Sequence, residues 1–213
     1  MRTQTKYFPK AYGLKTQADI NNLYDDWADT YDTEVKENGY VSPTRLASAL
    51  ESFLSFDALI YDVGCGTGLS GVALKEMGFL NIHGSEINPN MLKKAQLTGA
   101  YQSLEIGDIS NPFPDNVGSY DAIVAVGVIG AGAAPAKLMS EALNALSPGG
   151  LLAFSLNDAA MAQKSCQGEL NNILKNGLAT ELFSEYGPHL STINVGSTIY
   201  ILQKADKKTG DLV

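Results

Sequence analysis

Short apolar runs alternate with longer amphipathic segments along most of this 213-residue chain. A short apolar run is typical of a buried strand, whereas apolar residues at three- and four-residue spacing predict a helix. We therefore expect strands at Leu59–Val63, Leu80–Ser85, Gln102–Ile106, Tyr120–Val126 and Leu151–Leu156, and two further strands at Leu190–Asn194 and Thr198–Gln203. Helical patterns separate most of them, which is the alternation of an α/β domain with a mainly parallel sheet.

The first quarter of the chain carries helical patterns that precede this alternation. Four apolar residues share one face of a predicted helix: Ile20, Leu23, Trp27 and Tyr31. A second helix is expected to start at Ser42-Pro43 and to run to about Phe53. We interpret residues 1–55 as an N-terminal helical lid, residues 56–204 as the core and residues 205–213 as a tail, all within a single domain, 1–213.

The most informative stretch is Leu59–Gly68, where an apolar run breaks into glycines at alternating positions, Gly64, Gly66 and Gly68. A helical pattern follows from Leu69. Glycine lets the backbone adopt a positive φ and lets a ligand approach without meeting a Cβ atom. The N–H groups at the start of the following helix point toward such a turn. The stretch is therefore predicted to hold a small ligand against bare backbone.

The spacing of the glycines indicates which ligand this is. Turns that bind dinucleotides read G-x-G-x-x-G, but Leu69 occupies the sixth position here, so an NAD- or FAD-dependent oxidoreductase is the least favoured alternative. Glu86 stands at the end of the next predicted strand, 24 positions after Asp62. A carboxylate at this spacing can accept hydrogen bonds from both hydroxyls of a ribose.

Several motifs in this order resemble the class I S-adenosylmethionine-dependent methyltransferases. They are the G-x-G-x-G turn, the Tyr24–Asp32 segment (Y-D-D-W-A-D-T-Y-D), Ser119-Tyr120-Asp121, and the L-x-P-G-G-x-L turn at 146–152. The resemblance implies a Rossmann-like doubly wound seven-stranded sheet, six strands parallel and the last antiparallel, with added N-terminal helices. Within the superfamily, the chain particularly resembles the methyltransferase-like protein of the Williams–Beuren region and its bacterial relatives.

The same resemblance implies S-adenosylmethionine as cofactor and S-adenosylhomocysteine as product. The N-terminal aromatic residues would close over the methionine part, where a cationic sulfonium is attracted to an aromatic face. Acids and apolar residues after the second and third strands would hold the ribose and the adenine. The residues implied for the cofactor are Tyr24, Trp27, Tyr31, Asp62, Gly64, Cys65, Gly66, Thr67, Gly68, Glu86, Ile87, Met91, Gly107, Asp108, Ile109, Val126 and Gly127.

The function implied is methyl transfer to a small-molecule acceptor. The segment after the fourth predicted strand, Gly127–Gly132, contains only small or aliphatic residues and no catalytic motif. A general base is needed only if the nucleophile stays protonated until the transition state, and we name Tyr24, Tyr31 and His189 as candidates. A non-catalytic protein that binds S-adenosylmethionine or S-adenosylhomocysteine is the alternative.

Composition narrows the class of protein further. The net charge is −8, from 15 Lys and Arg against 23 Asp and Glu, so nucleic acid is not expected as a partner. No apolar run is long enough to span a bilayer, so no membrane partner is expected. Two cysteines, Cys65 and Cys166, give neither a disulfide framework nor a metal-binding spacing, and a cytoplasmic location follows. The pattern does not predict an oligomeric state.

Overall fold

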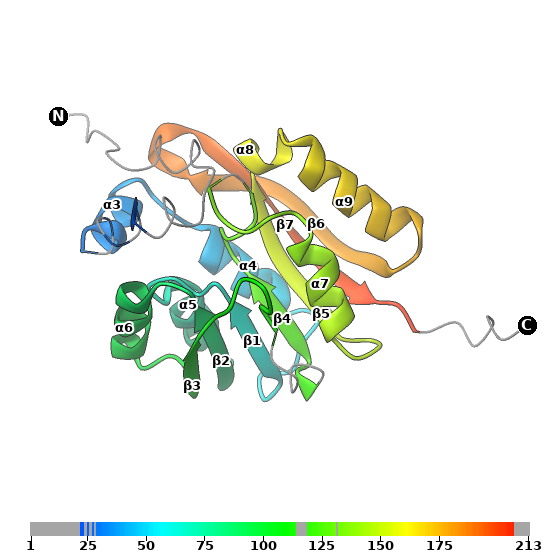
Figure 1. Cartoon of the computed structure of the whole chain (residues 1–213), viewed down its shortest axis with the longest axis horizontal. Helices are drawn as coiled ribbons and strands as arrows, with labels where there is room; N and C mark the ends of the chain where they lie inside the picture. Colours follow the sequence, from blue (N-terminus) through cyan, green and yellow to red (C-terminus); the bar gives the residue numbers. More distant parts are fainter. Residues whose placement is uncertain are drawn as a thin grey trace, which may run out of the picture.

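The fold is built on one seven-stranded sheet (Figure 1). The structure is a computed structural model that describes residues 22–23, 25, 27, 29–113, 119–130 and 132–206. The strands are β1 (Leu59–Val63), β2 (Asn81–Glu86), β3 (Ser103–Ile106), β4 (Ala122–Ala125), β5 (Leu151–Asn157), β6 (Ala179–Leu190) and β7 (Val195–Lys204). Their order across the sheet is β3-β2-β1-β4-β5-β7-β6.

The strand directions confirm the predicted fold. Strands β1 to β5 pair in parallel wherever they are neighbours. Strand β7 is antiparallel to both β5 and β6, so β6 runs in the same direction as the first five. The sheet thus has six parallel strands and one antiparallel last strand. The order reverses between β1 and β4, and ligands bind in α/β sheets at such a reversal, beyond the carboxyl ends of the strands.

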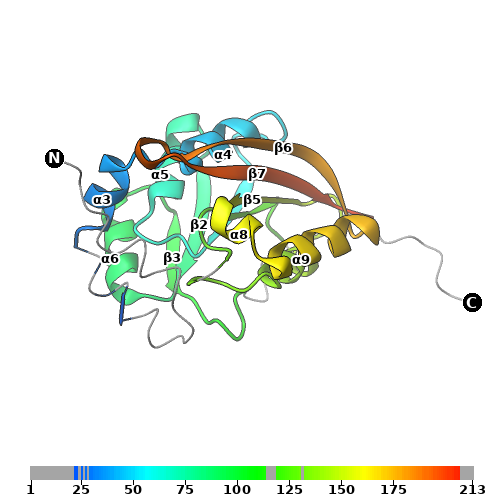
Figure 2. The same cartoon turned by 90° about the horizontal axis from the view of Figure 1, so that it is seen from above.

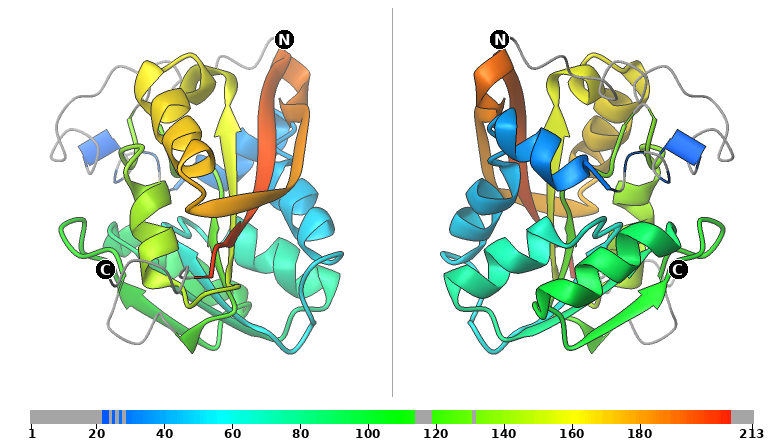
Figure 3. Two further views of the ribbon diagram at one scale, coloured as in Figure 1. Left: turned by 90° about the vertical axis from the view of Figure 1, so that its right-hand side faces the viewer. Right: turned by 90° about the vertical axis from the view of Figure 1, so that its left-hand side faces the viewer.

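Helices cover both faces of the sheet (Figure 3). On one face lie α4 (Ser42–Leu50) and α5 (Leu69–Met77), and on the other lie α7 (Leu138–Ala145) and α9 (Lys164–Lys175). The remaining described helices are α3 (Tyr31–Glu37), α6 (Pro89–Thr98), α8 (Asp158–Met161) and the 3-10 turn η2 (Ser191–Ile193). Within the described ranges, no helix has the length and apolar character needed to cross a membrane.

Helix α4 belongs to the core, although the sequence analysis assigned it to the lid. Leu46, Ala47 and Leu50 are buried and pack in one cluster with residues of α5 and the sheet, including Leu74 and Ile60. The assignment failed because a helix that precedes the first strand can still turn an apolar face onto the sheet. Tyr31, before α4, and Pro43, in its first turn, both lie at the carboxyl ends of the strands.

The position predicted for the sixth strand was wrong. Strand β6 ends at Leu190 instead of starting there, and the chain reverses through η2 and Asn194, whose φ is 55°. Strand β6 contains Pro188 and is the edge strand, where proline is tolerated because no ladder hydrogen bond is lost. A register shift between Pro188 and Leu190 accommodates it. The long β6–β7 hairpin runs beside α4 (Figure 2).

Candidate cofactor site

The glycine turn joins β1 to α5 at the reversal of the strand order, as the sequence predicted. All three glycines have positive φ. A Cβ atom added at Gly66 would meet nothing within 4 Å, so this part of the backbone is bare and faces open space. At Gly68 a Cβ atom would lie 3.0 Å from the Cα atom of Ala95, so this glycine allows α5 and α6 to pack closely. Gly68 does not line the cavity described below.

Glu86 lies next to the turn, at the carboxyl end of β2. Its Oε2 accepts the N–H of Gly66 at 2.9 Å, and its Oε1 accepts the N–H of Asn88 at 2.8 Å. The side chain of Asn88 in turn caps α6 by accepting the N–H groups of Asn90 and Met91. Burial raises the pKa of Glu86, while the backbone hydrogen bonds oppose that shift. The local structure therefore fixes the carboxylate at the edge of the bare turn.

Asp62 lies behind the turn and does not reach the cavity. It is completely buried, and its Oδ2 accepts hydrogen bonds from the hydroxyls of Ser70 and Tyr101. Burial raises the pKa of Asp62 to about 6, against the effect of these two hydrogen bonds. Its other oxygen, Oδ1, has no hydrogen-bond partner in the structure. Asp62 therefore ties β1 to α5 and to the start of β3, and it supports the turn from below.

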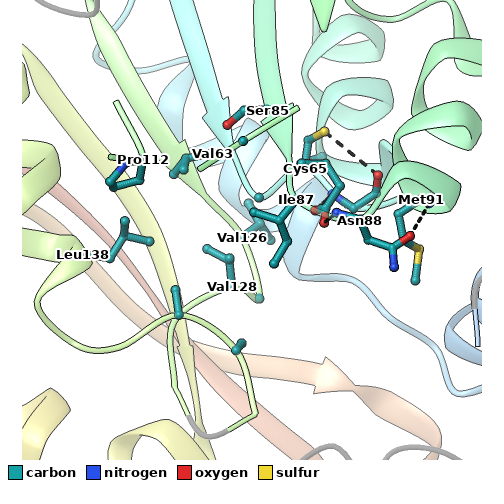
Figure 4. A pocket seen from close by; sticks show the side chains of 18 of the residues that line it. Val63, Cys65, Ser85, Ile87, Asn88, Met91, Pro112, Val126, Val128 and Leu138 are labelled. Atoms are coloured by element: carbon teal, nitrogen blue, oxygen red, sulfur yellow. Dashed lines mark hydrogen bonds between the residues drawn. The ribbon is translucent and has the colours of Figure 1, made fainter. Parts of the chain in front are cut away.

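A cavity of about 160 Å³ opens at the carboxyl ends of β1, β2 and β4 (Figure 4). In this view Ile87, Asn88 and Met91 lie on one side and Pro112 and Leu138 on the other, with Val126 and Val128 between them. The predicted residues that line the cavity are Tyr31, Gly64, Cys65, Gly66, Thr67, Glu86, Ile87, Met91, Gly107, Asp108, Ile109, Val126 and Gly127. The fold thus brings together predicted residues from five separate segments of the chain.

Asp108 lines the cavity but also has a local role. Its Oδ1 accepts the backbone N–H and the hydroxyl of Ser110 at 2.8 and 2.7 Å, which is the geometry of a loop cap. These hydrogen bonds lower the pKa of Asp108, so the group is a carboxylate at neutral pH. The second oxygen of this exposed carboxylate is therefore the one placed to serve a ligand.

The N-terminal aromatic residues have different positions. Tyr31, the first residue of α3, lines the cavity. Trp27 is buried beside it, with ring centroids 4.8 Å apart, and donates its indole N–H to Glu34 at 3.0 Å. Trp27 therefore packs behind Tyr31 and does not face the cavity. Tyr24 lies outside the described residues. A hydrogen bond from the hydroxyl of Thr67 to Asp32 links α3 to the glycine turn.

His189 does not reach the cavity either. It is buried near the end of β6, and its Nδ1 lies 2.8 Å from the hydroxyl oxygen of Ser42. Burial lowers the pKa of His189 to about 4; Asp158 opposes this shift and Arg45 adds to it. Its ring contacts the edge of Tyr40. His189 thus belongs to a buried polar cluster that joins the β6–β7 hairpin to the start of α4.

Several lining residues were not predicted from the sequence. Tyr40 comes from the connection between α3 and α4, and Pro43 from the first turn of α4. Pro112 and Leu138 come from the loop after β3 and the start of α7. None belongs to a recognisable motif. The only usable signal was position, because Pro112 follows a predicted strand and Leu138 lies in the helical pattern between the fourth and fifth predicted strands. Tyr40 had no such signal, since it precedes the core in the sequence.

Comparison with known proteins identifies part of the chain. Residues 61–154, which carry the turn, Glu86, Asp108 and Gly127, match the family described as "Methyltransferase domain". The middle of this chain is similar to that family. With the fold, the match supports the class I S-adenosylmethionine-dependent methyltransferase superfamily, and with it S-adenosylmethionine as the cofactor.

Two named proteins are similar to this chain over more than half of its length. Human methyltransferase-like protein 27 is 36% identical over 68% of the chain, and the match spans 60% of the human protein. Magnesium protoporphyrin IX methyltransferase from Synechocystis PCC 6803, solved with bound SAM, has a TM-score of 0.56 at 18% identity and covers 96% of the chain and 92% of its own. None of the relatives named here carries a Williams–Beuren designation, so that narrower resemblance stays a prediction.

The relatives overturn one prediction from composition. The 18S rRNA (guanine-N(7))-methyltransferase of Bos taurus is 33% identical over 33% of the chain and 25% of its own length. A relative of this domain thus acts, by its name, on RNA, and the exclusion of nucleic acid was wrong. Net charge is a property of the whole chain, whereas contact with phosphates requires only a local basic surface.

Proposed function

We propose that this protein transfers a methyl group from S-adenosylmethionine to an acceptor. One observation carries the proposal: the bare backbone at Gly66 faces a cavity, and the carboxylate of Glu86 is fixed at its edge. The first feature suits a ligand that approaches the main chain closely. The second suits a vicinal diol such as that of a ribose. The narrower resemblance to the Williams–Beuren region protein is part of this proposal.

Different lining residues of the cavity suit the ribose and the adenine of S-adenosylmethionine. Each oxygen of Glu86 accepts one backbone N–H and keeps acceptor capacity for a ribose hydroxyl. Ile87, Met91 and Leu138 offer apolar surface to a flat base, and the carboxylate of Asp108 can accept from an amino group. The other predicted lining residues would complete the site.

The chemistry requires little from the protein beyond alignment. The sulfonium of S-adenosylmethionine supplies an activated methyl group. The chain binds and orients the reactants and excludes water, and alignment of this kind lowers a barrier by about 7–11 kcal/mol in favourable cases. Tyr31 lines the cavity and stays a candidate for a polar contact, whereas buried His189 lies outside it and is not proposed as a base.

Calorimetric titration with S-adenosylmethionine, S-adenosylhomocysteine and NAD tests the cofactor. We expect the first two to bind at micromolar concentration and NAD not to bind. Glu86→Ala should weaken binding at least tenfold, because a carboxylate hydrogen bond contributes about 1.5–3 kcal/mol. Glu76→Ala, on the exposed side of α5, is the matched control and should bind as the unaltered protein does. Binding of NAD alone, or of none of the three, would refute the proposal.

A second experiment assigns the acceptor. S-adenosylmethionine labelled in its methyl group is incubated with the protein and either a small-molecule cell extract or purified rRNA. Label in the small-molecule fraction would support the acceptor class predicted from the sequence. Label in rRNA would assign the RNA class instead, and cofactor binding without label in either fraction would favour the non-catalytic alternative.

A further inference from the structure

The segment after β4 has no side chain at its second position, Gly127. The backbone there is held by a hydrogen bond from the N–H of Gly127 to the hydroxyl of Ser155 at 2.8 Å, and its φ is 70°. A Cβ atom added to Gly127 would lie 2.7 Å from the hydroxyl oxygen of Tyr40. Tyr40 therefore occupies the space that a side chain at position 127 would take, and both residues line the cavity.

Tyr40 is held in this place by the β6–β7 hairpin. Its backbone forms an isolated antiparallel bridge with Leu190, and the next N–H, that of Val41, donates to the carbonyl of His189 at 3.0 Å. The rings of Tyr40 and His189 meet edge to face, with centroids 5.0 Å apart at 78°. His189 is fixed in turn by Ser42. Two segments that are distant in sequence, 40–42 and 189–190, thus position one phenol.

The strand order indicates which part of the cofactor would lie near Tyr40. Asp108 follows β3, Glu86 ends β2, the glycine turn follows β1, and Gly127 follows β4, and these strands are successive neighbours in the sheet. A ligand with its base near Asp108 and its ribose on Glu86 would extend across the turn toward Gly127. The end of the ligand that carries the sulfonium would therefore reach the position where Tyr40 lies.

We infer that Tyr40 binds the sulfonium end of S-adenosylmethionine and replaces the side chain that Gly127 lacks. The inference rests on the proposed function. The neighbouring wall of the cavity is apolar, formed by Val126, Val128 and Ala133, so the hydroxyl of Tyr40 supplies polarity there. A phenol oxygen has two lone pairs, and its ring presents a face that attracts a cation. Both features favour the charged cofactor over its uncharged thioether product.

The test compares two ligands that differ only in the methyl group and its charge. S-adenosylmethionine and S-adenosylhomocysteine are titrated calorimetrically into the full chain, into Tyr40→Phe and into Tyr186→Phe. Tyr186 is the matched control, because it lies on the exposed surface of β6, away from the cavity, and its hydroxyl donates to Asp158 of α8. We expect Tyr40→Phe to weaken the binding of S-adenosylmethionine about fivefold, because the contact between the phenol oxygen and the cation is lost, and that of S-adenosylhomocysteine less than about twofold.

Other outcomes would overturn the inference. If Tyr40→Phe weakened the binding of both ligands equally, the hydroxyl would contact a part of the ligand that they share. If it weakened the binding of neither, the hydroxyl of Tyr40 would not contact the ligand. Failure of the unaltered protein to bind either ligand would refute the proposed function itself, so the two failures are distinguishable. A double-mutant cycle adds a second test: Gly127→Ala should weaken S-adenosylmethionine less when combined with Tyr40→Phe, because the hydroxyl it would meet is gone.

Discussion

Buried His189 should make the stability of this protein depend on pH between about 4 and 6.5. Burial lowers the pKa of His189 from 6.5 to about 4, so the unfolded chain binds this proton more readily than the folded one. The contribution of His189 to the free energy of unfolding is therefore fully present above pH 6.5 and is lost as the pH decreases toward 4. The loss from this group is about 1.4 kcal/mol between pH 7.5 and 5.5, and about 3 kcal/mol below pH 4.

The assay compares the unaltered protein with His189→Gln, which keeps a polar side chain but does not titrate. Free energies of unfolding are measured by urea denaturation from pH 8 to 5. The titration of Asp62 changes the free energy of unfolding in the opposite direction. Burial raises the pKa of Asp62 to about 6, so the folded state binds this proton more readily than the unfolded state does. That contribution is common to both proteins and cancels in their difference, which isolates His189.

We expect the advantage of the unaltered protein over His189→Gln to shrink by about 1.4 kcal/mol from pH 7.5 to 5.5. A difference that stays constant within the error of the measurement would show that the pKa of His189 is not lowered. A difference that grows at low pH would show the opposite shift, as expected if Asp158 outweighed burial and Arg45. Either result would refute the electrostatic reasoning about the cluster around Ser42.

Three further predictions concern the turn, the lid and the core. Gly66→Ala should fold, with a free energy of unfolding lower by about 1–2 kcal/mol because φ at this position is 58°. Calorimetry should nevertheless detect at least tenfold weaker binding of S-adenosylmethionine, since the new methyl group would occupy the open side of the turn. Unchanged affinity would contradict this prediction. Asp32→Asn weakens the hydrogen bond from Thr67, so stopped-flow measurement should show several-fold faster release of S-adenosylmethionine. An unchanged rate would show that this link between α3 and the glycine turn does not control release. Leu50→Ala should lower the free energy of unfolding in urea by about 2–5 kcal/mol, whereas exposed Leu97→Ala should lie within about 0.5 kcal/mol of the unaltered protein.

The sheet and part of the cavity could be predicted because their signals are local. The glycine turn, Glu86 and the start of α6 at Asn88 each depend on residues close together in sequence, and the parallel order then brings the carboxyl ends of successive strands to one edge. Asp62 and Gly68 belong to the predicted motif but do not line the cavity. A motif defines which residues form a turn, whereas packing against Tyr101 and Ala95 decides which of them face the cavity.

The sequence by itself determined the alternation of strands and helices, the bare turn and the acid beside it, because hydrophobic period and glycine spacing act over a few residues. Only the tertiary structure decided that α4 belongs to the core, that β6 contains Pro188 as an edge strand, and that Tyr40 stands against Gly127. The physical reason is the same in each case. These features arise from contacts between segments that can be 100 or more residues apart, and no local pattern of apolar and polar positions records which distant segment will supply the partner.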